Sequence, residues 1–342
     1  MPKRVSNPPN RFSIEHLEHE DGEAPWAALE LYEEDAKSIL SENDSPDLGF
    51  RWSLNPYRGC QHGCSYCYAR QTHEYWGFGA GTDFERRIVV KRNAPELLRA
   101  ELDARRWKGE LIVFSGNTDC YQPVEGALRL TRRCLEVCLE YKNPVGIITK
   151  GVLVERDLDV LARLAREAQA RVFVSIAFAD DDVARAMEPG APSPSRRFDV
   201  LSKLSDAGIT TGVSLAPIIP GLNDAVVPEV LERARAAGAS RAFLSLVRLP
   251  RTVLPVFEER LSDSFPTRAA KIRAAIREVR GGKPNDSRFG ERMVGEGPRW
   301  KLVEDVFATQ CARLGITTTD ASPPPPTTFR RPTPQLELWD RA

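Results

Sequence analysis

The chain has 342 residues, of which 42% are hydrophobic, so it is long enough for one large domain with a buried core and extensions. Its 48 basic residues balance 48 acidic residues, so net charge gives no support to a nucleic-acid partner, which would need a local basic patch. The first ten residues are polar and basic, and no apolar stretch approaches membrane-spanning length. We therefore expect a cytoplasmic protein without a membrane partner, whose seven cysteines are ligands, reactive thiols or core residues.

The N-terminal arm, residues 1–45, contains prolines and an acidic run, and we expect it to be partly ordered. Within the arm, residues 26–40 are expected to form one amphipathic helix. Residues 49–54 then alternate apolar and polar side chains, which predicts a strand. This strand leads the chain directly into a cysteine-rich loop.

The loop carries Cys60, Cys64 and Cys67 and is interrupted by one proline and two glycines, so it can fold its thiolates toward one centre. Three soft ligands on one loop indicate a metal. A 4Fe-4S cluster held by three cysteines leaves one iron with an open site, where a small chelating molecule can bind and be reduced. Two alternatives remain: a Cys3His zinc site that includes His62, and a disulfide framework, which needs an oxidising compartment and an even number of cysteines.

A regular alternation of apolar strands and helical patterns follows the loop. Further strands are predicted at residues 111–115, 145–149, 172–178, 211–219 and 243–247. The helical patterns begin at Pro95 and continue at residues 128–141, 157–168, 198–207 and 226–237. Glycines stand where two of these helices should end, in 207–209 and 237–239. The pattern makes six β/α units and predicts an α/β fold whose parallel sheet closes, or partly closes, into a barrel.

The cysteine spacing, with the aromatic Tyr66 just before Cys67, resembles that of the radical S-adenosylmethionine (radical SAM) enzymes. The resemblance implies a six-unit (β/α)6 partial TIM-type barrel over residues 46–250, with a helical and irregular, basic extension at 251–316. In that family S-adenosylmethionine chelates the open iron through its amino and carboxylate groups. One electron from the cluster then cleaves it to methionine and a 5′-deoxyadenosyl radical. An electron donor such as flavodoxin or ferredoxin is implied as a partner.

Functional residues of such barrels gather at the carboxyl ends of the strands. There the family resemblance implies contacts to the amino group of S-adenosylmethionine from Ser115, Gly116 and Asn117, and contacts to its adenine from Pro217 and Ile219. Its carboxylate and ribose hydroxyls are expected to meet polar groups drawn from Thr149, Lys150, Ser175, Glu188, Arg196 and Arg197. One of the two arginines is the expected carboxylate partner, and the alternative for either is a solvated salt bridge.

The remaining cysteines divide into two groups. Cys134, Cys138 and Cys311 lie in helical patterns and are expected to be small core residues. Cys120 follows the second strand at the expected rim of the active site. Its thiol is either a hydrogen-atom donor to a substrate radical or a lining residue.

A narrower resemblance is to the spore photoproduct lyases, which repair a thymine dimer by radical hydrogen abstraction. It is carried by Tyr66-Cys67-Tyr68, by the pair Thr118-Asp119 and by the pair Thr149-Lys150. It implies lyase-like repair of a DNA lesion. A radical SAM enzyme acting on an RNA base, a peptide or a metabolite is the first alternative. A non-catalytic metal-binding adaptor is the second.

Two C-terminal features bear on partners. The segment Arg268–Lys301 is basic and includes a glycine-rich, arginine-studded stretch, which favours contact with DNA phosphates, although a solvated helix face explains its first half equally well. Residues 317–342 are expected to be a proline-rich linker too extended to pack, which ends in a peptide motif. The motif resembles the peptide that binds the bacterial sliding clamp, through Gln335, Leu336, Leu338 and Trp339, with tryptophan in place of phenylalanine.

Overall fold

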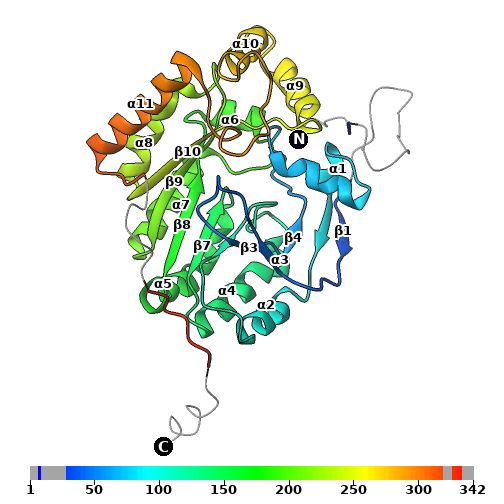
Figure 1. Ribbon diagram of the computed structural model, residues 1–342, viewed down its shortest axis with the longest axis vertical. Helices are drawn as coiled ribbons and strands as arrows, with labels where there is room; N and C mark the ends of the chain where they lie inside the picture. The colour runs from blue at the N-terminus through cyan, green and yellow to red at the C-terminus, as the bar shows by residue number, and fades with distance from the viewer. Residues whose placement is uncertain (1–6, 9–27, 319–325, 333–342) are drawn as a thin grey trace, which may run out of the picture.

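A mostly parallel sheet forms the centre of the protein, as the computed structural model in Figure 1 shows; residues 7–8, 28–318 and 326–332 are described. Its seven strands lie in the order β10-β9-β8-β7-β6-β3-β2. They are β2 (Leu40–Glu42), β3 (Trp52–Leu54), β6 (Ile112–Phe114), β7 (Val145–Thr149), β8 (Ala170–Ser175), β9 (Thr210–Ile218) and β10 (Arg241–Leu246). All neighbours pair in parallel except β2, which pairs antiparallel with β3.

Amphipathic helices follow the strands and pack their apolar faces on the sheet (Figure 1). They are α2 (Ala94–Asp103), α3 (Glu125–Leu128), α4 (Leu130–Glu140), α5 (Leu158–Glu167), α6 (Asp181–Met187), α7 (Pro194–Asp206) and α8 (Val227–Ala236), with the short 3-10 helices η2 (Val152–Asp157) and η3 (Asp224–Val226). The strands are almost wholly buried, because helices and the opposite side of the curved sheet cover them. The predicted α/β class and mostly parallel sheet are confirmed.

A small second sheet, in the order β1-β5-β4, departs from the sequence-based prediction. It consists of β1 (Glu30–Glu33), β4 (Tyr57–Arg58) and β5 (Arg87–Val90), and the short helix α1 (Thr82–Arg86) precedes β5. The helix expected over residues 26–40 is wrong in the described part, because the apolar strand β5 takes β1 as a parallel partner. These insertions separate β3 from α2, so the six-unit count of the barrel stays a prediction.

The C-terminal extension contains α9 (Val253–Ser264), α10 (Ala269–Glu278) and α11 (Gly297–Leu314). The loop between α10 and α11 crosses from one edge of the sheet toward the other. Leu246 N, in β10, donates to Met293 O at 2.9 Å, and Arg292 forms an ion pair with Asp47, between β2 and β3. Gly290 N also donates to Asp47 Oδ1 at 2.6 Å. The loop therefore bridges the gap between β10 and β2 that a partial barrel leaves open.

The expectation that the chain beyond residue 317 does not pack is wrong for residues 326–332. Phe329 stacks on Tyr141 with ring centroids 6.3 Å apart, and Arg331 donates to the carbonyl oxygens of Leu102, Ala104 and Trp107. Phe329 and Arg331 therefore supply contacts that the proline-rich composition of this segment did not predict. In the described part of the chain, no helix is long and apolar enough to cross a membrane.

Candidate active site

The cysteine loop lies between β4 and the 3-10 helix η1 (Tyr68–Trp76), beside the carboxyl ends of the parallel strands. Cys60 and Cys64 are buried, Cys67 is half-buried, and all three are free thiols. Burial raises the pKa of the Cys60 thiol, and so do the negative charges of Asp119 and of the other two cysteines. The three cysteines thus share one short, mostly buried loop, and their role as cluster ligands stays a prediction.

Arg70 holds the loop in shape from beneath and is completely buried. Its guanidinium donates to the carbonyl oxygens of Cys64 at 2.9 Å and Gly63 at 3.0 Å, and to Glu85 Oε1 at 2.6 Å. It also donates to the carbonyl oxygens of Ala80 and Gly81, both at 2.9 Å. One planar cation thus fixes two turns of backbone relative to each other, which lysine with its compact ammonium cannot do.

The segment that follows β6 forms side-chain hydrogen bonds to the backbone of the cysteine loop. Gln122 Nε2 donates to Gly59 O at 3.1 Å, its Oε1 accepts from Gln61 N at 3.0 Å, and Thr118 Oγ1 also donates to Gly59 O. Gln61 Oε1 in turn accepts from Val124 N at 2.7 Å. The side-chain amides of Gln61 and Gln122 therefore each bond the backbone of the other's segment. These bonds hold the cysteine loop in place and leave the thiols free.

Asp119 joins the cysteine loop to the end of β7. Its carboxylate lies 3.3 Å from His62 Nδ1 and accepts from Thr149 Oγ1 at 2.5 Å and from Lys150 N at 2.7 Å. Burial alone would raise the pKa of Asp119, but the charge and hydrogen bond of His62 and the bonds from the end of β7 hold that pKa well below its usual range. The two residue pairs 118–119 and 149–150, which are far apart in the sequence, meet at this carboxylate.

Glu188 forms a second buried centre behind the third cysteine. It accepts hydrogen bonds from Tyr66 Oη and from Arg197, and Lys150 Nζ lies 3.9 Å from its Oε1. The adjacent backbone also docks on the cysteine loop, since Gly190 N donates to His62 O at 2.9 Å. A Cβ at Gly190 would lie 2.2 Å from Gln61 O, so only glycine permits this approach.

Lys150 is the predicted residue best placed to meet an anion at the cysteines. Burial lowers the pKa of its ammonium, but the negative charges of Cys64 and Glu188 outweigh burial and raise it. Arg197 is completely buried and donates to Glu188, Ser175 O and Pro192 O, and Arg196 is exposed and pairs with Asp199. The structure thus gives both arginines other partners, and their contact with S-adenosylmethionine stays a prediction.

The end of β6 has the unusual backbone expected near a ligand. Ser115 has φ 141° and Gly116 has φ 116°, and a serine in this region is strained. Tyr68 Oη donates to Gly116 O at 2.5 Å, which ties this turn to the residue after Cys67, and Asn117 is exposed beside it. On the far side of the sheet mouth, Pro217 is half-buried and Ile219 is buried in the core.

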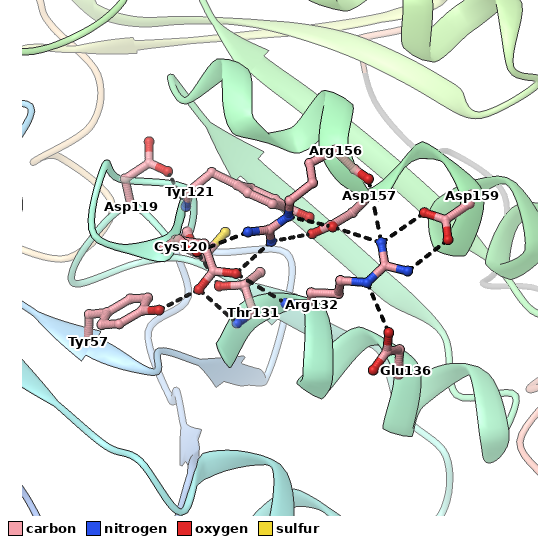
Figure 2. Close-up of polar contacts among 11 residues, drawn as sticks. Tyr57, Asp119, Cys120, Tyr121, Thr131, Arg132, Glu136, Arg156, Asp157 and Asp159 are labelled. Atoms are coloured by element: carbon pink, nitrogen blue, oxygen red, sulfur yellow. Dashed lines mark hydrogen bonds and ion pairs between the residues drawn. The ribbon is translucent and has the colours of Figure 1, made fainter. Parts of the chain in front are cut away.

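Cys120 lies in the main hydrophobic core and is 0% exposed. Burial raises the pKa of its thiol, as do the charges of Asp119 and Glu125, so the sulfur keeps its hydrogen. Thr131 Oγ1 donates to Cys120 O at 2.6 Å and fixes the residue to the start of α4 (Figure 2). The structure therefore places Cys120 as a buried, protonated thiol, and its role as a hydrogen-atom donor stays a prediction.

A buried network of charged groups supports this segment from behind (Figure 2). Glu125 accepts from Tyr57 in β4, from Thr131 N at 3.0 Å and from Arg156 at 2.7 Å. Arg156 also pairs with Asp157 at 2.8 Å. Each buried carboxylate is paired and hydrogen-bonded, so the network can hold the segment rigidly against the cysteine loop.

These residues fit an iron-sulfur cluster by the chemistry of their donors. Among the described residues, no group of three His, Cys, Asp or Glu side chains is compact enough to bind a single metal ion. A 4Fe-4S cluster attaches each cysteine to a different iron, so its ligands need not converge on one atom. Cys134, Cys138 and Cys311 are buried in helices, as predicted for core residues.

Residues 54–234 match the family model described as the Radical SAM superfamily. The chain belongs to the radical SAM superfamily. Members of this superfamily use a 4Fe-4S cluster and S-adenosylmethionine, and these are the cofactors of the chain.

The radical SAM chain is 38% identical over 207 residues to an uncharacterized protein of Mycobacterium tuberculosis, a match that covers 60% of this chain and 61% of the relative. An uncharacterized protein of Methanocaldococcus jannaschii is 31% identical over 196 residues, covering 57% of this chain and 70% of that one. A Radical SAM Nalpha-GlyT isomerase of Pseudomonas phage M6 is 26% identical over 213 residues, covering 61% of this chain and 42% of the isomerase.

Among solved structures, the radical SAM chain resembles spore photoproduct lyase complexed with dinucleoside spore photoproduct. The TM-score is 0.61 at 16% identity, and the match covers 84% of this chain and 81% of the lyase. At this identity the likeness shows the fold alone. The predicted similarity to the spore photoproduct lyases is therefore confirmed at the level of the fold.

Sequence reasoning found the three cysteines but missed much of what holds them. Arg70, Gln122 and Glu125 carried no signal, because a buried arginine, amide or carboxylate looks in sequence like a surface residue. Asn223 was missed too, although its Nδ2 donates to Ala177 O at 2.7 Å and to Pro217 O at 3.0 Å and so shapes the end of β9. Its neighbourhood of glycine and proline was the only hint.

Proposed function

We propose that this radical SAM enzyme acts on a lesion in DNA, with lyase-like chemistry of the kind that repairs a photoproduct. The observation that carries the proposal is the meeting of residues 118–119 and 149–150 at the carboxylate of Asp119, against the cysteine loop. These are the residue pairs on which the resemblance to the spore photoproduct lyases rests. The fold likeness to a lyase complexed with dinucleoside spore photoproduct supports the same substrate class.

The residues of the chain divide the work as follows. Cys60, Cys64 and Cys67 hold the cluster, which when bound supplies the electron that cleaves S-adenosylmethionine to methionine and a 5′-deoxyadenosyl radical. Lys150 offers a cation to the methionine carboxylate, and the turn at Ser115 brings backbone groups toward the amino group.

Cys120 completes the proposed reaction as a hydrogen source. The substrate loses one hydrogen atom to the deoxyadenosyl radical, and the product radical takes one hydrogen atom from the thiol of Cys120. The thiyl radical left on Cys120 then needs one electron and one proton, which the reductant and solvent supply. The raised pKa of this thiol keeps the S–H bond intact until that step.

Three partners belong to the proposal. DNA contact through Arg268–Lys301 draws on the exposed side chains of Lys271, Arg277 and Lys283, since Arg273, Arg288, Arg292, Arg299 and Lys301 form ion pairs within the chain. The sliding clamp is proposed to bind residues 335–339, which lie outside the described residues. A flavodoxin or ferredoxin is the proposed electron donor, in the cytoplasm.

A radical SAM enzyme on an RNA base, a peptide or a metabolite is the second candidate. The phage relative is named an Nalpha-GlyT isomerase and not a lyase, which supports keeping radical chemistry other than a lyase reaction as a candidate. The other reading of the sequence, a non-catalytic metal-binding adaptor tethered to the clamp, does not agree with the 4Fe-4S cluster and S-adenosylmethionine that the superfamily uses.

The deciding experiment measures 5′-deoxyadenosine formed by the anaerobically reconstituted protein with S-adenosylmethionine and dithionite. Ultraviolet-irradiated DNA is compared with the same DNA before irradiation. We expect more deoxyadenosine, and loss of photoproducts, with irradiated DNA. Equal cleavage with both DNAs and intact photoproducts would overturn the lesion substrate and leave the second candidate.

A further inference from the structure

Arg248 stands at the carboxyl end of β10, on the rim of the sheet where the cysteine loop lies. Its guanidinium lies over the ring of Tyr68, 4.8 Å from the ring centroid. It is half-buried, and it forms no ion pair or hydrogen bond with another residue in the part of the chain that the structure describes. A partly desolvated arginine without a counter-ion costs free energy, so its position calls for an anion that is not part of the described chain.

The electrostatic surroundings of Arg248 make this need stronger. Burial lowers the pKa of its guanidinium, and the positive charge of Arg292 lowers it further. Arg292 has its own carboxylate partner, Asp47, whereas Arg248 receives only the more distant attraction of Asp47 and the ring of Tyr68. An anion bound at Arg248 would therefore meet one uncompensated positive charge.

Tyr68 contacts Arg248 directly, and a second exposed ring, Phe289, lies on the nearby Arg292. Phe289, on the loop that bridges β10 and β2, is 59% exposed and packs on Arg292 with 4.4 Å from the guanidinium carbon to the ring centroid. Tyr68 is 38% exposed and directly follows Cys67. Exposed aromatic rings next to an unpaired arginine are the pairing used to hold nucleotides, since the rings stack on bases and the cation binds phosphate.

We propose that Arg248 binds a backbone phosphate of a nucleic-acid strand at the mouth of the active site, with the exposed ring of Phe289 beside it for a base. This inference rests on the proposed function, because it names how that substrate is held. It assigns a binding site to the rim of the barrel, apart from the basic segment that sequence analysis selected.

The carboxylate of S-adenosylmethionine is the other anion that a cation near this loop can bind. Lys150 is the better match for it, since its Nζ lies 3.9 Å from Glu188 Oε1 and over the ring of Tyr66, the residue just before Cys67. Arg248 lies over the ring of Tyr68, the residue that follows Cys67. The inference therefore assigns Lys150 to the cofactor and Arg248 to the substrate.

The test is equilibrium binding of a fluorescein-labelled single-stranded thymidylate oligomer to the anaerobically reconstituted protein, measured by anisotropy at several salt concentrations. Arg248→Gln should weaken binding about tenfold and reduce the slope of log affinity against log salt by about 0.7, the value for one phosphate contact on a single strand. Arg251→Gln, which removes an exposed arginine three residues away, is the matched control and should have little effect.

A second oligomer with uncharged methylphosphonate linkages isolates the phosphate contact. The wild type and Arg248→Gln should bind this oligomer equally well, because the variant loses only an interaction that the uncharged backbone cannot make. Arg248→Lys keeps the charge and should recover part of the affinity, and the melting temperature of each variant checks its folding.

Two results would overturn the inference: equal binding of the normal oligomer by the wild type and Arg248→Gln, or weaker S-adenosylmethionine binding by Arg248→Gln without any oligomer. The latter would assign Arg248 to the cofactor carboxylate. If Arg248→Gln loses oligomer affinity but irradiated DNA does not stimulate deoxyadenosine formation, the phosphate site stands and only the lesion substrate fails.

Discussion

At the scale of single residues, the shape of the cysteine loop depends on side chains that are not among the predicted cluster ligands. Arg70 shows this most clearly, because its five hydrogen bonds all go to the loop or to the turn packed beneath it. Its charge is buried and paired with Glu85. Removing such a partner leaves both a buried carboxylate and several carbonyl oxygens unsatisfied.

Arg70→Met keeps the length of the side chain and removes every donor. We expect the free energy of unfolding to fall by about 3–5 kcal/mol. We also expect less iron per chain after reconstitution, because Gly63 O and Cys64 O lose their shared donor. Iron content and thermal unfolding measure the two effects.

Arg133→Met is the control, since Arg133 forms an exposed pair with Glu96 that contributes less than about 1 kcal/mol. Wild-type iron content in Arg70→Met would contradict this account of the loop.

Cys120 and Cys134 allow packing to be separated from chemistry, because both are completely buried thiols in the same core. Each change to alanine removes one sulfur atom and should cost a similar, small amount of stability. Only Cys120→Ala should alter the products formed from irradiated DNA, with abortive products replacing repaired thymine. Product analysis by mass spectrometry measures this. The same products from both variants would assign Cys120 to packing alone.

At the scale of elements, the sequence predicted what periodicity controls. The strand at 145–149 was predicted at its observed bounds, and those near 112, 172, 211 and 243 within about three residues, since buried parallel strands are continuous apolar runs. The small sheet β1-β5-β4 escaped, because β1 is short, exposed and charged and is formed only through its pairing with β5. The sequence selected the cysteine loop and polar residues at the strand ends, Glu188 among them, and their roles stay predictions. The hydrogen bonds and ion pairs by which Gln122, Asp119 and Glu188 hold that loop join distant segments, and no local pattern encodes them.

The packing of η1 against β5 makes the stability of the protein dependent on pH. His73, in η1, bonds Arg87 O through Nε2 at 2.8 Å, whereas its Nδ1 is buried and has no hydrogen-bond partner among the described residues. Burial lowers the pKa of His73 to about 4, from an ordinary value near 6.5. As pH falls from about 6.5 to about 4, His73 therefore binds a proton in the unfolded chain but stays neutral in the folded chain.

This difference should cost up to about 3 kcal/mol of stability by pH 4 and nothing above pH 7. In His73→Phe the free energy of unfolding should depend less on pH across that window, because the proton-binding group is gone. Urea unfolding of both proteins at several pH values between about 4 and 7 tests this. Parallel curves for the two proteins would show that His73 has the same pKa in the folded and unfolded chain, which would contradict the shift.

At the scale of the whole molecule, the two ends of the sheet carry different contacts. The cysteine loop lies at the carboxyl ends of the strands, whereas Thr327 and Thr328 donate to Gly109 O and Lys142 O, just before β6 and β7. Figure 1 shows residues 326–332 at the lower end of the molecule, away from the helices of the C-terminal extension. The chain is thus anchored at the end opposite the active site before it reaches the proposed clamp peptide.

Anchoring and clamp binding should therefore be separable by mutation. Phe329→Ala removes the stack on Tyr141 and should lower the free energy of unfolding by about 1–2 kcal/mol, with the affinity for the clamp unchanged. The double variant Leu338→Ala, Trp339→Ala should do the reverse. It removes two apolar anchors of the peptide and should weaken clamp binding at least tenfold, with no loss of thermal stability.

Surface plasmon resonance on immobilised clamp and thermal unfolding provide the two readouts. Unchanged clamp affinity in the double variant would make the motif accidental, whereas loss of affinity in Phe329→Ala would show that the clamp also reads the anchored segment.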